Sequence, residues 1–74
     1  MFFNYDQFII DRNTALFTLD FFKIKEFYAK YHIQPPKDKD EFWRQVYKTI
    51  LRLPEAPKTC VKVASTWLKK NGGI

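Results

Sequence analysis

Cysteine, histidine and glycine are scarce in this chain, and each scarcity excludes a class of chemistry. The 74 residues include one Cys and one His, so an internal disulfide and a metal site built from paired imidazoles are both excluded. The two glycines, Gly72 and Gly73, stand at the very end, which leaves no glycine-rich loop to hold a phosphate. Cys60 and His32 lack the orienting signature of a nucleophile and its base. We expect a non-enzymatic protein with no cofactor, no metal and no small-molecule substrate.

Long apolar runs are also missing. No stretch approaches the length needed to cross a bilayer, and the first residues lack the basic flank and apolar run of a signal peptide. We expect the lone Cys60 to be a small buried residue, as a free thiol in a reducing compartment usually is. These features predict a cytoplasmic protein with no membrane partner.

Aromatic residues, in contrast, are abundant. The chain has eight Phe, four Tyr and two Trp, and large rings bury much apolar area for each residue that is ordered. This compensates for a length near the lower limit for a single core. We therefore expect residues 1–74 to form one helical domain, with some rings left over at the surface for a partner.

Apolar residues recur at helical spacing in four segments separated by proline or capping signals. The predicted helices are residues 5–17, 20–32 and 38–51, and a fourth that begins at a Thr59 cap and ends at Asn71-Gly72. Thr18 or Asp20 is the expected cap of the second. A β-hairpin over residues 8–17 is the alternative for the first segment, but neither arm alternates cleanly. The predicted fold class is all-α, with four short helices around an aromatic-rich core.

The periodicity also predicts which residues face inward. In the first segment these are Tyr5, Phe8, Ile9, Leu16 and Leu19, and in the last they are Cys60, Val61, Val63, Ala64, Trp67 and Leu68. Three apolar residues fall away from the expected core faces and are candidate anchors for a partner: Ile10, Phe17 and Phe22.

The net positive charge resides in the second half of the chain. Residues 1–36 carry four basic and four acidic groups, so the whole net charge of +5 resides in residues 37–74. Arg44, Lys48 and Arg52 lie four apart along one predicted helix face, and Lys62 and Lys69 lie seven apart on the next. Such rows can neutralise phosphates or meet an acidic protein. They can equally be ordinary solvated faces, paired in part with Asp40 and Glu41.

These features favour a small interaction protein that binds another protein, with sequence-tolerant nucleic-acid binding as the alternative. A helix-turn-helix is disfavoured, because residues 33–37 between the second and third segments contain two prolines instead of a tight turn. Self-association into a homodimer is a third possibility, in which the second apolar faces cover one another.

The pattern as a whole resembles short uncharacterised helical proteins of prophage and mobile-element regions in Gram-positive bacteria. The matching features are Asp11-Arg12, Thr18-Leu19-Asp20, Tyr31-His32-Ile33 before a proline, Phe42-Trp43, and Trp67-Leu68 before a terminal Gly. The resemblance implies a setting and no defined activity. Small proteins of that origin often bind host proteins or nucleic acid, and anti-CRISPR inhibitors are one such class.

Overall fold

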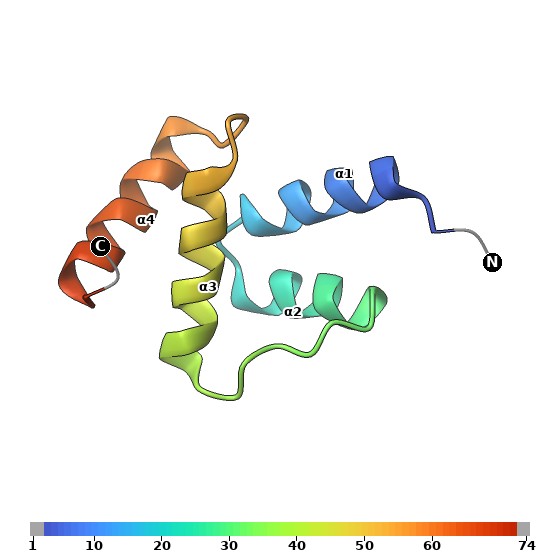
Figure 1. Ribbon diagram of the computed structural model, residues 1–74, viewed down its shortest axis with the longest axis horizontal. Helices are drawn as coiled ribbons and strands as arrows, with labels where there is room; N and C mark the ends of the chain where they lie inside the picture. Colours follow the sequence, from blue (N-terminus) through green and yellow to red (C-terminus); the bar gives the residue numbers. More distant parts are fainter. Residues whose placement is uncertain (1–2, 73–74) are drawn as a thin grey trace. The chain divides into compact units, whose positions relative to one another are not determined.

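The computed structural model describes residues 3–72 and contains four α-helices, labelled in Figure 1. They are α1 (Tyr5–Leu16), α2 (Phe21–Lys30), α3 (Lys39–Arg52) and α4 (Lys58–Lys70). No strand occurs in that range, so the all-α prediction is confirmed and the hairpin alternative for residues 8–17 is wrong. Gly73 lies outside the described residues.

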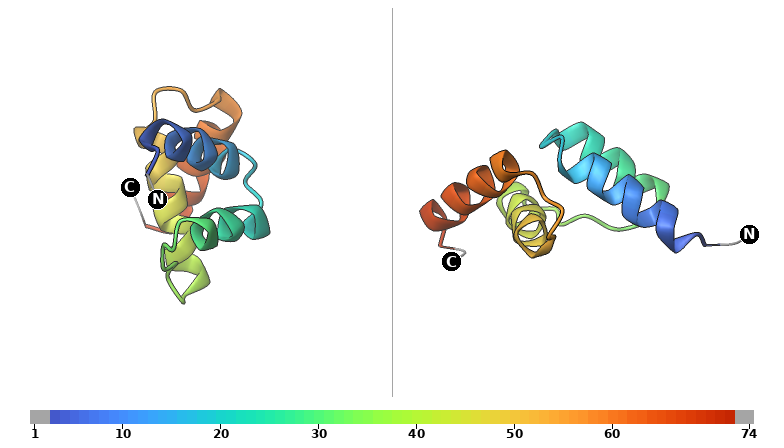
Figure 2. Two further views of the ribbon diagram at one scale, coloured as in Figure 1. Left: turned by 90° about the vertical axis from the view of Figure 1, so that its right-hand side faces the viewer. Right: turned by 90° about the horizontal axis from the view of Figure 1, so that it is seen from above.

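Backbone contacts divide the chain into two units, Met1–Gln34 and Pro35–Ile74. In the first unit α1 and α2 pack side by side, and in the second α3 and α4 do the same, as two perpendicular views show (Figure 2). Each unit is a helical hairpin closed by a short connection, residues 17–20 in the first and residues 53–57 in the second. The single domain over residues 1–74 stays a prediction.

The starts of three helices follow their capping side chains. Asn4 accepts a hydrogen bond from the backbone N–H of Gln7 (3.0 Å) at the start of α1. Asp20 and Asp38 accept from backbone N–H groups in the first turns of α2 and α3. Each satisfies donors that a helix N-terminus leaves unpaired. Of the two expected caps for α2, Asp20 is therefore the one used.

The start of α4 differs from the prediction, because Thr59 is not its cap. The helix begins at Lys58 and its N-cap is Pro57, which makes no side-chain capping bond. The carbonyl of Pro57 already accepts from the N–H of Val61 (3.0 Å). The ring of Pro57 fixes its φ at −59°, and this conformation brings the chain into the helix earlier than the hydroxyl of Thr59 would.

His32 ends α2 in a left-handed conformation, with φ 56°. Its N–H donates to the carbonyl of Ala29 (3.2 Å), and the N–H of Ile33 donates to the carbonyl of Tyr28 (2.8 Å). These two bonds form a Schellman motif, in which the left-handed residue satisfies the last carbonyls of the helix. The single histidine thus occupies the position where glycine is usual.

The core of the second unit follows a spacing of four residues on both helices. On α3 the buried side chains include Phe42, Val46 and Ile50, and on α4 they are Cys60, Ala64 and Leu68. Side chains four apart form a single ridge along a helix. Burial of Cys60 agrees with its expected role as a small apolar residue.

Partly buried rings pack around Phe27, which is buried in the core of the first unit with Ala15, Leu16 and Ile24. Phe8 of α1 lies 5.5 Å from Phe27 and 4.9 Å from Tyr31, centroid to centroid. The contact with Tyr31 is edge-to-face, an arrangement that aromatic pairs favour. The abundant aromatic residues therefore do help to close this hairpin.

Two residues expected to face inward are exposed. Tyr5 is 65% exposed, since the buried residues of α1, Ala15 and Leu16, belong to its last turn. Val63 is 42% exposed. The buried ridge of α4 is centred on Ala64, and Val63 lies about 100° around the helix from it. Both inward assignments are wrong.

A pair of adjacent residues on α3 tests the packing of the second unit. Ile50 is fully buried and Leu51 is 37% exposed. We expect Ile50→Ala to lower the free energy of unfolding by about 3 kcal/mol, because it leaves a cavity. Leu51→Ala should cost about 1 kcal/mol or less. Urea denaturation followed by circular dichroism measures both, and equal losses would contradict the observed rotation of α3.

The left-handed conformation of His32 makes a second prediction. We expect thermal stability to decrease in the order glycine, asparagine, valine at this position. Glycine adopts positive φ without steric cost, asparagine tolerates it, and a β-branched side chain does not. Melting temperatures of His32→Gly, His32→Asn and His32→Val at one pH give the order. A His32→Val protein as stable as His32→Gly would show that the motif is not formed.

Candidate interaction surface

Arg44, one of the predicted basic residues, is engaged within the second unit. Its Nη1 lies 2.7 Å from Oε2 of Glu41, and its Nη2 donates to the carbonyl of Asn71 (3.3 Å). The first contact is the predicted pairing along one helix, while the second joins α3 to the residue that ends α4. Arg44 therefore helps to hold the hairpin, and only about a third of its side chain is exposed.

The other four predicted cations, Lys48 and Arg52 on α3 and Lys62 and Lys69 on α4, are exposed. Within residues 3–72 none of them has an ion-pair or hydrogen-bond partner. Their charges therefore remain available to an anionic partner.

The three candidate apolar anchors all lie in the first unit. Phe22 is 74% exposed and Ile10 is 57% exposed, so both present apolar surface to solvent as predicted. Phe22 makes an edge contact with the ring of Phe21, at a centroid distance of 5.5 Å. Phe17 is half-buried just after α1, and so offers less surface than the other two.

A shallow hollow runs along α4 and is lined by Lys62, Val63, Thr66, Trp67 and Lys70. We call it the α4 hollow, and its volume is about 380 Å³. Val63 and Trp67 supply its apolar surface. The ring of Trp67 packs against the ring of Tyr47, at a centroid distance of 5.4 Å. The lining residues within the described range 3–72 all come from one helix, so no described residue forms an opposite wall. The α4 hollow therefore suits a surface of another molecule better than an enclosed small ligand.

Sequence reasoning identified only Lys62 among the residues of the α4 hollow. Val63 and Trp67 were assigned to the core, and Lys70 was not among the candidate contact residues. The spacing of apolar residues could have revealed the exposed position of Val63, because Cys60, Ala64 and Leu68 already complete a buried ridge. The pair of apolar residues at positions 63 and 67 is therefore a second, neighbouring stripe.

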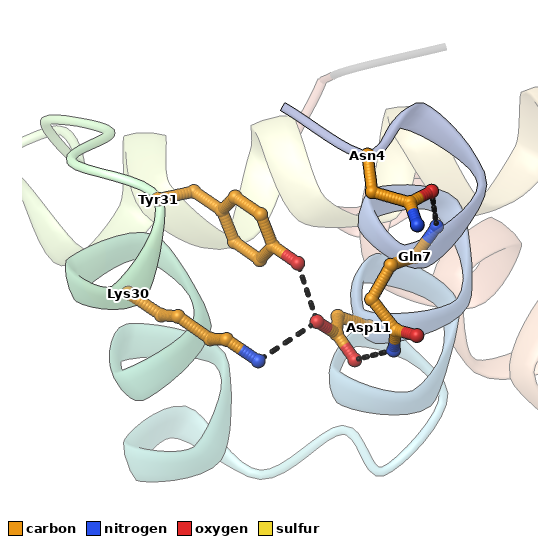
Figure 3. Close-up of polar contacts among 5 residues, drawn as sticks. All are labelled: Asn4, Gln7, Asp11, Lys30 and Tyr31. Atoms are coloured by element: carbon orange, nitrogen blue, oxygen red, sulfur yellow. Dashed lines mark hydrogen bonds and ion pairs between the residues drawn. The ribbon is translucent and has the colours of Figure 1, made fainter. Parts of the chain in front are cut away.

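One cluster of titratable groups joins α1 to α2 (Figure 3). The carboxylate of Asp11 accepts hydrogen bonds from Nε2 of Gln7 (2.9 Å), from Nζ of Lys30 (3.0 Å) and from the hydroxyl of Tyr31. The hydrogen bond from Tyr31, with those from Lys30 and Gln7, lowers the pKa of Asp11 to about 2. The hydrogen bond to Asp11 raises the pKa of both Lys30 and Tyr31.

These shifts are opposite to those that acid–base catalysis requires. A catalytic carboxyl that acts as an acid or base near neutral pH has a raised pKa, and a catalytic lysine has a lowered one. Here every group is instead held in its ordinary charge state. The cluster therefore acts as a polar connection between the two helices.

Residues 3–72 contain no group of three or more His, Cys, Asp or Glu side chains placed to hold a metal ion. In the same range, no helix combines the length and the apolar character that crossing a lipid bilayer requires.

The low pKa of Asp11 predicts how stability responds to acid. A carboxyl whose pKa falls from an ordinary 3.8 to about 2 on folding stabilises the protein above about pH 4. That stabilisation is lost as the pH falls toward 2. Asp11→Asn should therefore lower the melting temperature at pH 6 but change it little at pH 2, and Asp6→Asn is the control on the same helix.

A direct reading of the same pKa comes from carbon-13 NMR of the Asp11 carboxyl. We expect a midpoint near pH 2 in the wild type and a higher midpoint in Tyr31→Phe, which removes the hydroxyl donor. A wild-type midpoint near the ordinary value would mean that the cluster is not formed in solution.

Comparison of the chain with protein-family models, with curated proteins and with solved structures gives no match.

Proposed function

We propose that this chain is a non-enzymatic interaction protein that binds another protein. The observation that carries the proposal is the α4 hollow, where Val63 and Trp67 expose apolar surface between Lys62 and Lys70. An exposed apolar centre with a charged rim is the usual organisation of a protein interface. Trp is also among the residues that contribute most to binding energy in such interfaces.

The resemblance to prophage and mobile-element proteins fits this proposal. It suggests an inhibitor or adaptor that acts on a host or phage protein in the cytoplasm. The exposed rings of the first unit, above all Phe22, offer a second place for the partner to contact. Its edge contact with Phe21 leaves most of the ring of Phe22 accessible.

Nucleic-acid binding is the second candidate, favoured by the cations that have no partner within residues 3–72: Lys48, Arg52, Lys62 and Lys69. If these four contacted phosphates, affinity would fall about a hundredfold between 50 and 200 mM salt. The two candidates therefore differ in their dependence on salt.

Affinity capture tests the proposal. The tagged chain is incubated with a nuclease-treated extract of Gram-positive bacterial cells, and retained proteins are quantified at about 150 mM salt. We expect one protein to be retained in stoichiometric amount by the wild type, and to be lost with Val63→Glu or Phe22→Glu. Sedimentation of the chain alone at several concentrations shows whether self-association competes.

A parallel titration with labelled DNA and RNA, read by anisotropy, supplies the contrary outcome. Binding to nucleic acid that collapses with salt, together with protein capture that disappears after nuclease treatment, would replace the proposal with the nucleic-acid alternative. Charge reversal at Lys48 and Arg52 should then weaken binding, while Phe22→Glu should do so only through its added charge.

A further inference from the structure

We infer that the α4 hollow binds an acidic amphipathic helix of the partner protein, an inference that rests on the proposed function and specifies its site. The helix would place apolar side chains on Val63 and Trp67 and carboxylates beside Lys62 and Lys70. Charge, backbone hydrogen bonding and the spacing of residues along α4 each favour such a partner.

Charge selects an acidic partner. From Lys58 to Lys70, α4 carries four lysines and no acidic residue. Within residues 3–72 neither Lys62 nor Lys70 has an ion-pair or hydrogen-bond partner. Both stand at the rim of the α4 hollow, where carboxylates of a partner would meet them without being fully desolvated. Contacts of this kind set specificity and orientation at modest energy.

Backbone hydrogen bonding selects a helix over an extended segment. Between its first and last turns the backbone groups of α4 are paired within the helix itself, so this face offers no continuous row of donors and acceptors to an added strand. Thr66 contributes a neutral polar side chain to the lining of the α4 hollow. A partner helix satisfies its own backbone and needs only an apolar stripe to dock, which is the arrangement of helix-in-groove recognition.

Spacing defines the stripe. The residues of the α4 hollow follow one another at positions 62, 63, 66, 67 and 70, so the two rim lysines are about 12 Å apart along the helix axis. A partner helix lying alongside α4 matches this with carboxylates seven or eight residues apart. Its apolar anchors would lie between them, three or four residues from the first carboxylate, on the same face.

The same geometry disfavours a nucleic acid at this particular place. Stacking needs an open ring face, whereas Trp67 is half-buried and packs on Tyr47 with an interplanar angle of 51°. The neighbouring Val63 offers no π-face to a base. Guanidinium groups, which bind phosphate by two parallel hydrogen bonds, are also absent from the α4 hollow.

The test uses a synthetic capped helical peptide of about 18 residues, long enough to hold a helix. The peptide carries Leu at two positions one helical turn apart. On the same face, one Glu precedes the two Leu residues and another follows them. Amide and indole signals of the nitrogen-15-labelled full chain are followed as the peptide is added. We expect shifts at residues 62–70 and at the indole of Trp67. A peptide with Gln in place of Glu should bind roughly tenfold more weakly.

Variants of the chain locate the contact. The double variant Lys62→Glu with Lys70→Glu should weaken binding of the acidic peptide at least tenfold. The variant Lys23→Glu with Lys37→Glu has the same net charge but leaves α4 intact, and should bind within about twofold of the wild type once salt is near 150 mM. Val63→Glu should abolish binding, while Ile10→Glu, at an exposed apolar site of the first unit, should not.

Several outcomes would overturn the inference. They are no shifts with the acidic peptide, equal binding of the Gln peptide, equal weakening by the two charge-reversal pairs, and shifts confined to Phe22 and Ile10. Displacement of the peptide by a single-stranded oligonucleotide at 150 mM salt would assign the face to nucleic acid instead. The wild-type titration alone decides the first case, so the result does not depend on whether the variants fold. Protein capture that is lost with Val63→Glu, while the acidic peptide does not bind, would leave the proposed function standing while this inference fails.

Discussion

The surface of α4 depends on how α4 is rotated against α3. Burial of Cys60, Ala64 and Leu68 fixes that rotation, because these side chains form one ridge that must be removed from water. Every other residue of the helix then takes its place by the geometry of 3.6 residues per turn. Val63 is turned outward, the ring of Trp67 lies between core and solvent, and the lysines face away from the buried ridge.

Each hairpin combines ring contacts with a polar connection between its two helices. In the first unit, rings of Phe8, Phe27 and Tyr31 contact one another, and the carboxylate of Asp11 gathers donors from both helices. In the second unit the ridge of Cys60, Ala64 and Leu68 is buried, the rings of Tyr47 and Trp67 contact one another, and Arg44 joins α3 to the end of α4. Polar groups in both hairpins therefore serve the fold.

Charge on the second unit divides into two kinds. Arg44 is paired with Glu41 and with a backbone carbonyl, so its charge is largely compensated within the unit. The lysines of α4 are not compensated in this way, since α4 contains no acidic residue. That difference separates cations that stabilise the hairpin from cations that remain available to a partner, although all belong to the same basic half of the sequence.

Much of the fold could be predicted from the sequence, because helical periodicity, acidic caps and proline breaks are local properties of the chain. They located all four helices to within a few residues, and they indicated Asp20 and Asp38 as starts. They could not decide that Val63 faces solvent or that Arg44 is engaged with Asn71. The apolar stripe of α4 is wider than the surface that α3 can bury. Several rotations of α4 about its own axis are therefore consistent with the sequence, and only the packing of α3 on α4 selects one of them. The sequence by itself thus determined the helices and the sign of their charge, whereas the tertiary structure decided which residues of α4 a partner can reach.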